Sequence, residues 1–114
     1  MIYTQSDFKS YARPNLKGGG GEVLITEFVP KEAMTNCRLI CEQVVPTGAS
    51  IGRHVHLNET EFYLIHKGTG IVIEADGEKP VGPGDVVVTG HGEMHSVVNT
   101  GDDDLVMTAI IVTH

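Results

Sequence analysis

Three histidines and one glutamate are spaced so that their side chains could meet at one point. His54 and His56 are two residues apart in a predicted strand, so their imidazoles face the same way, with Cα atoms roughly 7 Å apart. Glu61 follows just past a break at Asn58, and His95 opens another predicted strand far along the chain. Chance rarely combines a His-x-His pair with a following glutamate and a later histidine between glycine turns. We therefore treat these four residues as one candidate site.

Two further residues flank these four and are candidates for catalysis. Tyr63 lies two residues after Glu61, so alternation places both on the same strand face, where the phenol could orient a substrate. A tyrosine packed in the core is an equally good interpretation. His91 lies in the loop before His95 and could act as an acid or base. A solvated loop residue is the simpler interpretation of His91.

The candidate site resembles the two sequence motifs of the cupin family. The first motif matches without a mismatch and consists here of Gly48, His54, His56, Glu61 and Gly68. The second consists here of Gly84, Gly90, Gly92, His95 and Asn99. It departs from the family at Gly90, where cupins usually have proline, a change that affects the stiffness of the loop and not the ligands. The strand and turn pattern around both motifs resembles the same family.

This resemblance implies an all-β fold, the cupin jelly roll or double-stranded β-helix, in which antiparallel strands form a conical barrel. It also implies one divalent metal near the wider mouth, held by His54, His56, Glu61 and His95. Three imidazoles and one carboxylate, without a thiolate, suit Mn, Fe, Co, Ni, Cu or Zn, and we favour Mn or Fe. Four ligands leave two positions on a six-coordinate ion, whereas structural zinc prefers a closed set that includes cysteine.

The expected function is binding of a small oxygen-bearing metabolite, a carboxylate or keto acid, at this metal. We expect an enzyme of small-molecule metabolism, in which the metal acts as a Lewis acid or as a redox centre. The family resemblance leaves oxidoreductase, lyase and isomerase chemistry open. A non-catalytic module that binds or senses a metabolite is the alternative, and a cupin sugar isomerase or oxygenase is another.

Oxalate is a simple case of this prediction. Its oxygens could take the two open positions on the metal, so binding follows from the ligand set. Turnover requires in addition a positive group that polarises the substrate and an acid, usually on a mobile lid, that delivers a proton. Oxalate decarboxylases have an arginine three residues before the first motif histidine, where this chain has Ile51, and Arg53 should face away from the metal. We therefore predict that oxalate binds without conversion to formate.

The remainder of the chain must supply the strands that position these residues. Strands are expected at residues 22–29, 37–45, 53–57, 61–67, 71–74, 86–89, 95–99 and 105–113. Such short strands, with turns rich in glycine and proline between them, are typical of an all-β barrel or sandwich. Residues 1–21 are expected to form an N-terminal arm or edge strand that ends in a glycine-rich joint, and residues 22–114 a single barrel domain.

One early strand carries polar residues whose direction the sequence leaves open. Arg38, Glu42 and Gln43 lie on it, and alternation alone does not say which of its faces lines the barrel. An arginine or glutamine that faced inward would be a natural partner for an anionic ligand. Cys37 and Cys41 on this strand have Cα atoms roughly 13 Å apart, too far for a disulfide, and we expect two buried thiols.

Charge excludes several classes of partner. The chain has 15 acidic and 8 basic residues, for a net charge of -7 with histidine neutral. Nucleic acids and anionic membranes select clustered lysine and arginine, so neither is expected as a partner. The N-terminus lacks the pattern of a signal peptide, and no segment approaches the ~20 apolar residues of a membrane span. We expect a cytoplasmic protein with a small anionic ligand.

The outer surface predicts a homodimer. If Glu61 faces inward, Phe62 and Leu64 face outward and expose apolar surface that a monomer rarely leaves uncovered. The N-terminal arm could lie across a neighbouring chain, as small cupins commonly pair.

Overall fold

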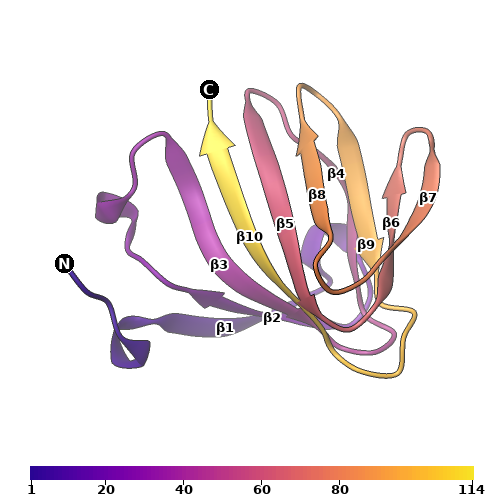
Figure 1. The fold of residues 1–114 in the computed structure, drawn as a ribbon, viewed down its shortest axis with the longest axis horizontal. Helices are drawn as coiled ribbons and strands as arrows, with labels where there is room; N and C mark the ends of the chain where they lie inside the picture. The colour runs from indigo at the N-terminus through magenta and orange to yellow at the C-terminus, as the bar shows by residue number, and fades with distance from the viewer.

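The computed structural model describes all residues, 1–114, as two antiparallel sheets that face each other (Figure 1). The six-stranded sheet has the order β1 (Lys9–Pro14), β2 (Glu22–Glu27), β3 (Cys37–Val45), β10 (Leu105–Thr113), β5 (Glu59–Lys67) and β8 (Val86–Gly90). The four-stranded sheet has the order β4 (Ser50–Val55), β9 (Met94–Val98), β6 (Gly70–Glu74) and β7 (Gly77–Val81). Three short 3-10 turns, η1 (Gln5–Asp7), η2 (Leu16–Gly18) and η3 (Lys31–Ala33), complete the chain, and none has the length or apolar character of a membrane-crossing helix.

The all-β antiparallel barrel predicted from the sequence is confirmed. Every expected strand is present, although β4 and β5 begin earlier than expected. One further strand, β7, begins at Gly77 and pairs with β6 as a hairpin. The break at Asn58 is a left-handed residue with φ of 57°, a conformation that asparagine tolerates better than most residues.

Alternation along the strands separates a buried inner face from an outer face. On β5, Glu61, Tyr63 and Ile65 are buried, whereas Phe62 and Leu64 are only half-buried, as the sequence predicts. The β10 strand follows the same period and buries its inward residues in the core, Leu105, Met107, Ala109 and Ile111. Cys37 and Cys41 are both free. Cys41 is fully buried, as expected, but Cys37, at the start of β3, is only half-buried, so the expectation of two buried thiols is wrong for Cys37.

The N-terminal segment lies along the sheet and packs on the strand that carries the first histidine. The β1 strand pairs with β2 at the edge of the six-stranded sheet. The glycine-rich segment that follows touches β4, where Gly20 and Ser50 exchange backbone and side-chain hydrogen bonds of 3.0 and 2.8 Å. Gly19 and Gly52 approach so closely that a Cβ on either would collide with backbone of the other segment. The division into an arm, 1–21, and a barrel, 22–114, stays a prediction.

Candidate metal centre

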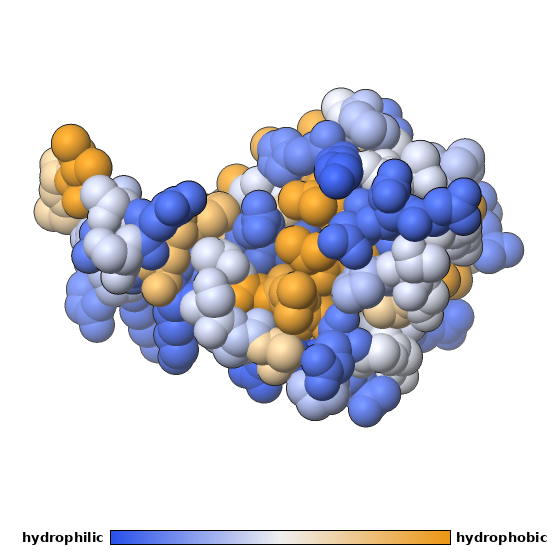
Figure 2. Space-filling view, turned by 90° about the horizontal axis from the view of Figure 1, so that it is seen from below, coloured by the Kyte–Doolittle hydropathy of each residue, from blue (hydrophilic) through white to orange (hydrophobic).

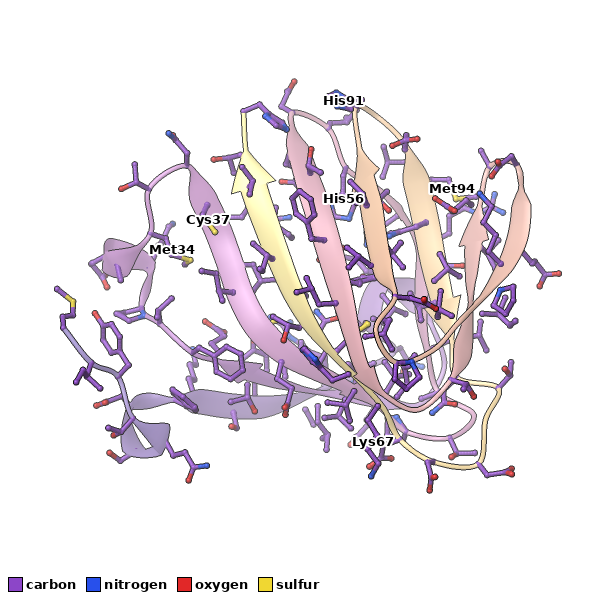
Figure 3. The ribbon with its side chains drawn as sticks, viewed as in Figure 1. Met34, Cys37, His56, Lys67, His91 and Met94 are labelled. Carbon is purple, nitrogen blue, oxygen red and sulfur yellow. The ribbon has the colours of Figure 1, made fainter.

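Three strands from both sheets bring the four predicted residues together. His54 lies on β4 and His56 directly after it, while His95 lies on β9 and pairs in register with His54. Glu61 projects from β5 in the opposite sheet, so the group spans the interior of the barrel. Figure 3 shows His56 inside the barrel, between the two sheets. One potential ligand atom from each of the four residues lies within 4.8 Å of the other three.

The imidazoles present their Nε2 atoms to a single carboxylate oxygen. Oε1 of Glu61 lies 2.9 Å from Nε2 of His56, 3.0 Å from that of His95 and 3.7 Å from that of His54. The Nε2 atoms themselves are 2.9 Å apart between His54 and His95 and 3.1 Å apart between His56 and His95. Four acceptor-capable atoms are thus crowded into one small volume.

The second nitrogen of each ring is already engaged. Nδ1 of His54 lies 2.7 Å from the carbonyl oxygen of Gly52, and Nδ1 of His56 lies 2.6 Å from a carboxylate oxygen of Glu59. Nδ1 of His95 lies 2.8 Å from the buried hydroxyl of Thr89. Carbonyl and carboxylate oxygens accept the Nδ1 proton, which leaves the Nε2 lone pairs directed to the centre.

The donor set fits a divalent transition metal. Oε1 of Glu61 is buried and has no hydrogen-bond partner, a condition that costs free energy unless something else satisfies the atom. A cation among Glu61 and the three Nε2 atoms would satisfy all four groups at once. Imidazole and carboxylate ligands without a thiolate suit the first-row metals.

Burial and mutual contact set the charges at the centre. Burial acts to raise the pKa of Glu61, but the surrounding imidazoles outweigh it and hold that pKa well below its ordinary range. Contact with the Glu61 carboxylate raises the pKa of His56, against the effect of burial. Burial lowers the pKa of His95, against the effect of the same carboxylate. Glu61 is therefore ionised and His95 is neutral at neutral pH, as metal coordination requires.

Tyr63 lies against the centre, where alternation along β5 predicted it. Its ring stacks on that of His95 with centroids 4.9 Å apart and planes 5° apart. Its hydroxyl oxygen is 3.5 Å from Nε2 of His95. Burial and then the negative charge of Glu61 raise the pKa of Tyr63 well above its ordinary value, so the phenol stays protonated and can donate a hydrogen bond.

His91, the other predicted candidate, lies apart from the centre. It is exposed at the rim, in the turn after β8 (Figure 3), with a left-handed φ of 55°. Its ring stacks near that of His114 at 6.0 Å, and both line a hollow separate from the barrel cavity. The structure therefore gives His91 no contact with the four clustered residues.

Sequence reasoning missed Glu59, which supports the centre from outside. Its carboxylate accepts a hydrogen bond from Nδ1 of His56 and two hydrogen bonds from Arg38, of 2.7 and 2.8 Å. Hydrogen bonds from Arg38, with a smaller contribution from His56, lower the pKa of Glu59 to about 2, against the effect of burial. The only signal in the sequence is its position three residues after His56, across the turn at Asn58.

The centre lies in a cavity of about 430 Å³. Gln43, on the inner face of β3, lines this cavity, whereas Glu42 does not. Arg38 also lines it, although simple alternation would place Arg38 with Glu42, because the pairing of β3 with β10 shifts register near the start of β3. Ile51 and Tyr63 form part of its wall, and Arg13 and Lys17 of the N-terminal segment are at its margin. Within this lining Glu61 is the single acidic residue.

Known proteins resemble the chain in sequence and in fold. Residues 41–111 match the family described as Cupin domain. The chain is 38% identical over 113 residues to the oxalate-binding protein of Thermotoga maritima, covering 98% of this chain and 93% of that protein. A Thermotoga maritima structure described as a predicted oxalate decarboxylase has a TM-score of 0.94 and 36% identity over 100% of both chains. A Cupin 2 conserved barrel domain protein from Salinispora arenicola has a TM-score of 0.69 and 26% identity, covering 79% of this chain and 75% of that one.

These similarities include the parts of the chain that build the centre. The matched range, 41–111, contains the two histidines of β4 and its end, the glutamate of β5 and the histidine of β9. The likeness to the Thermotoga maritima structure covers the whole chain and therefore includes the N-terminal strands as well. The jelly-roll barrel, the two motifs and the family match agree, and the chain belongs to the cupin family.

Proposed function

We propose that this cupin binds a small carboxylate at one divalent transition metal, with His54, His56, Glu61 and His95 as the protein ligands. The observation that carries the proposal is the convergence of three Nε2 atoms on an unpartnered, buried carboxylate oxygen. The nitrogen and oxygen donors, without a thiolate, suit the first-row divalent metals, and manganese or iron is the metal that we propose.

The residues around the centre have distinct tasks in this proposal. The metal supplies Lewis-acid attraction for the oxygens of the carboxylate. Glu59, Thr89 and the Gly52 carbonyl hold the imidazoles in orientation. Tyr63 remains a neutral phenol, which can donate a hydrogen bond to an oxygen of the bound anion.

Oxalate is the first ligand to examine, because a relative of 38% identity is named for binding it. The proposal for oxalate is binding without turnover. Ile51, only 2% exposed, occupies the wall where oxalate decarboxylases carry an arginine, and Arg53 is exposed outside the cavity. The single acid in the cavity lining is Glu61, which the metal would engage. The lining therefore has no free carboxylic acid to deliver the proton for decarboxylation.

A second candidate function is catalysis on a keto acid or a related metabolite. It is favoured by Tyr63, a buried phenol whose hydroxyl points at the centre from 3.5 Å. A group in that position can orient a substrate oxygen or return a proton to it. Turnover of a 2-oxo acid that is lost in Tyr63→Phe, with metal content unchanged, would support this second function.

Calorimetric titration tests the proposed binding. Oxalate is titrated into manganese-loaded protein and into the same protein after chelation, beside an assay for formate in the presence of oxygen. We expect heat of binding only with metal, and no formate. The variant His95→Ala should abolish binding, while His66→Ala, a substitution of an exposed histidine, should not. Binding that persists without metal would contradict the proposal, and repeated turnover would contradict binding without turnover.

We also propose that the chain forms a homodimer in the cytoplasm. On the outer face Phe62 pairs in register with Val88, and Leu64 pairs with Val86. Val86 and Val88 are 58% and 52% exposed, so these pairs form one apolar patch. Figure 2 shows apolar side chains gathered on the lower face of the molecule and at its N-terminal end. Ile2, near the N-terminus, is exposed.

Light scattering tests the dimer. We expect about twice the 12.3 kDa of one chain at micromolar concentration. The variant Val86→Lys with Val88→Lys should shift the mass to that of one chain. Its matched control, Val55→Lys with Leu57→Lys, changes exposed apolar residues away from the patch and should remain dimeric. A wild-type mass of 12.3 kDa would contradict the dimer.

A further inference from the structure

The cavity extends well beyond what oxalate needs. Its volume of about 430 Å³ lies in the range of pockets that hold whole metabolites. Oxalate consists of two carboxylates joined directly, and both would be used at the metal. The rest of the cavity then has no occupant, although its lining contains polar groups that require one.

Gln43 is the first of these groups. Its side chain is only 5% exposed and lines the cavity, and its Oε1 atom has no hydrogen-bond partner. Buried amide groups almost always find a partner, because an unmade hydrogen bond in the interior costs free energy. A ligand with polar atoms beyond the metal centre would provide that partner.

Two cations at the margin of the cavity are the second observation. Arg13, on β1, and Lys17, on η2, line the cavity, and neither side chain makes a salt bridge or a hydrogen bond within the chain. Arg38 lines the same cavity but is committed to Glu59. Arg13 lies over the ring of Tyr11, 5.4 Å from its centroid, but neither Arg13 nor Lys17 has an acidic partner. In a chain with a net charge of -7, two such cations at one opening favour an anionic group there.

The position of Lys17 is built into the fold. The contacts between Gly19 and Gly52 and between Gly20 and Ser50 hold η2 on β4, the strand that carries His54. Lys17 itself has a left-handed φ of 56°, which is uncommon for a residue other than glycine. Its side chain is therefore presented at the cavity by a fixed turn.

Apart from the residues of the centre, the cations and Gln43, the cavity wall is apolar or aromatic. The apolar side chains of this lining are Leu16, Ile25, Leu39, Ile51 and Ile111. Aliphatic carbon is the natural neighbour of such a wall, because contact removes apolar surface on both sides from water.

We infer that the natural ligand is a 2-oxo dicarboxylic acid longer than oxalate, with its second carboxylate at Arg13 and Lys17. The inference rests on the proposed function for its other end, where the oxo acid group meets the metal. The aliphatic middle lies along the apolar wall, and Gln43 supplies a polar contact to the ligand or to a water that it holds. Oxalate uses only the inner part of this site.

A matched pair of ligands tests the inference. The acids 2-oxoglutarate and 2-oxopentanoate share the oxo acid end and the chain, and differ in the distal carboxylate. Each is titrated calorimetrically into manganese-loaded protein at low salt, beside oxalate. We expect 2-oxoglutarate to bind about tenfold more tightly, which corresponds to two partly exposed ion pairs of modest strength.

Variants assign the preference to the two cations. Arg13→Gln with Lys17→Gln should lower the affinity for 2-oxoglutarate to that for 2-oxopentanoate. Lys31→Gln with Lys67→Gln removes the same charge from exposed residues outside the cavity lining and should keep the tenfold preference. Gln43→Leu should weaken 2-oxoglutarate binding without changing the metal content.

The possible outcomes separate the inference from the proposed function. Equal affinity for the two oxo acids, or a preference that survives in the variant of Arg13 and Lys17, would overturn the inference. Oxalate binding without 2-oxoglutarate binding would overturn it as well and leave the proposed function standing. No binding of any of the three acids to metal-loaded protein would overturn the proposed function itself.

Discussion

The inner end and the margin of the cavity are built on opposite principles. At the inner end the imidazoles of His54, His56 and His95 are largely buried, and every Nδ1 atom has a partner. At the margin Arg13 and Lys17 are exposed and have no acidic partner in the chain, although Arg13 lies over the ring of Tyr11. The inner end is thus organised before any ligand arrives, whereas the margin gains an acidic partner only from the ligand.

The affinity for the ligand and the selectivity among ligands therefore arise in different parts of the cavity. Groups that are fixed and desolvated act strongly on a charge placed among them, because no reorganisation is needed. Exposed side chains contribute less, since solvent and salt screen them. We therefore expect the inner end to hold the metal and one anionic group, and the margin to distinguish ligands of different length and charge.

Removing the metal should produce the largest change, a fall in thermal stability. This fall should depend on the residues of the inner end and not on those of the margin. A metal present at a thousand times its Kd stabilises the fold by roughly 4 kcal/mol. Chelation should therefore lower the Tm by on the order of 15 °C for a domain of this size. Calorimetric melting should show the same drop in Arg13→Gln with Lys17→Gln. It should show none in His54→Ala with His56→Ala, and a chelator-sensitive Tm in that variant would break the assignment.

Removing the hydrogen-bond partner that orients a ligand histidine should produce the next largest change, a loss of metal affinity. Glu59→Gln keeps an oxygen near His56 but removes the charge that orients the ring. Loss of such a partner typically lowers metal affinity by roughly 10- to 100-fold, and competition with a fluorescent chelator measures it. Asp76→Asn removes an exposed carboxylate from an ion pair with Lys79 and serves as the control, with affinity unchanged. Equal affinities of wild type and Glu59→Gln would contradict the support that we assign to this residue.

The Glu59 carboxylate should make the unfolding free energy of the metal-free protein depend on pH. The pKa of Glu59 falls from 4.5 to about 2 on folding, so ionised Glu59 favours the folded state. This contribution is fully present above pH 4.5 and is lost as the pH falls toward 2. Urea unfolding should therefore show that the difference in unfolding free energy between wild type and Glu59→Gln shrinks over this interval. A constant difference would mean that Glu59 does not titrate as described.

Salt should produce the smallest change, a loss of ligand affinity that arises only at the margin of the cavity. Raising the ionic strength from about 0.01 M to about 1 M shortens the Debye length from roughly 30 Å to roughly 3 Å. The affinity for 2-oxoglutarate should then fall a few-fold, toward that for 2-oxopentanoate, while metal content stays constant. Calorimetry at both ionic strengths measures the change. Equal salt dependence for the two acids would remove the contrast between margin and inner end.

The sequence predicted the inner end well because motif spacing and strand alternation are local. Two-residue periodicity places His54 with His56 and Glu61 with Tyr63, whatever the strands pair with. The meeting of His95 with His54 depends on β4 pairing with β9, which the family resemblance implied and the register shows. His91 shares a motif with His95, yet the turn after β8 carries it to the rim.

The margin could not be predicted because it depends on contacts between distant segments. Lys17 reaches the cavity through the approach of Gly19 to Gly52, and four glycines in a row give no sign of it. Gln43 needed the pairing of β3 with β10 to choose its face. The departure at Gly90 also has a packing cause, because a Cβ there would lie 2.5 Å from the hydroxyl of Thr60.

Elemental analysis of protein purified without added metal or chelator tests the central claim most directly. We expect about one transition-metal equivalent per chain in the wild type and none in His54→Ala with His56→Ala. Circular dichroism of both proteins establishes that the variant keeps its strands. A folded double variant with full metal content would contradict the assignment of this centre.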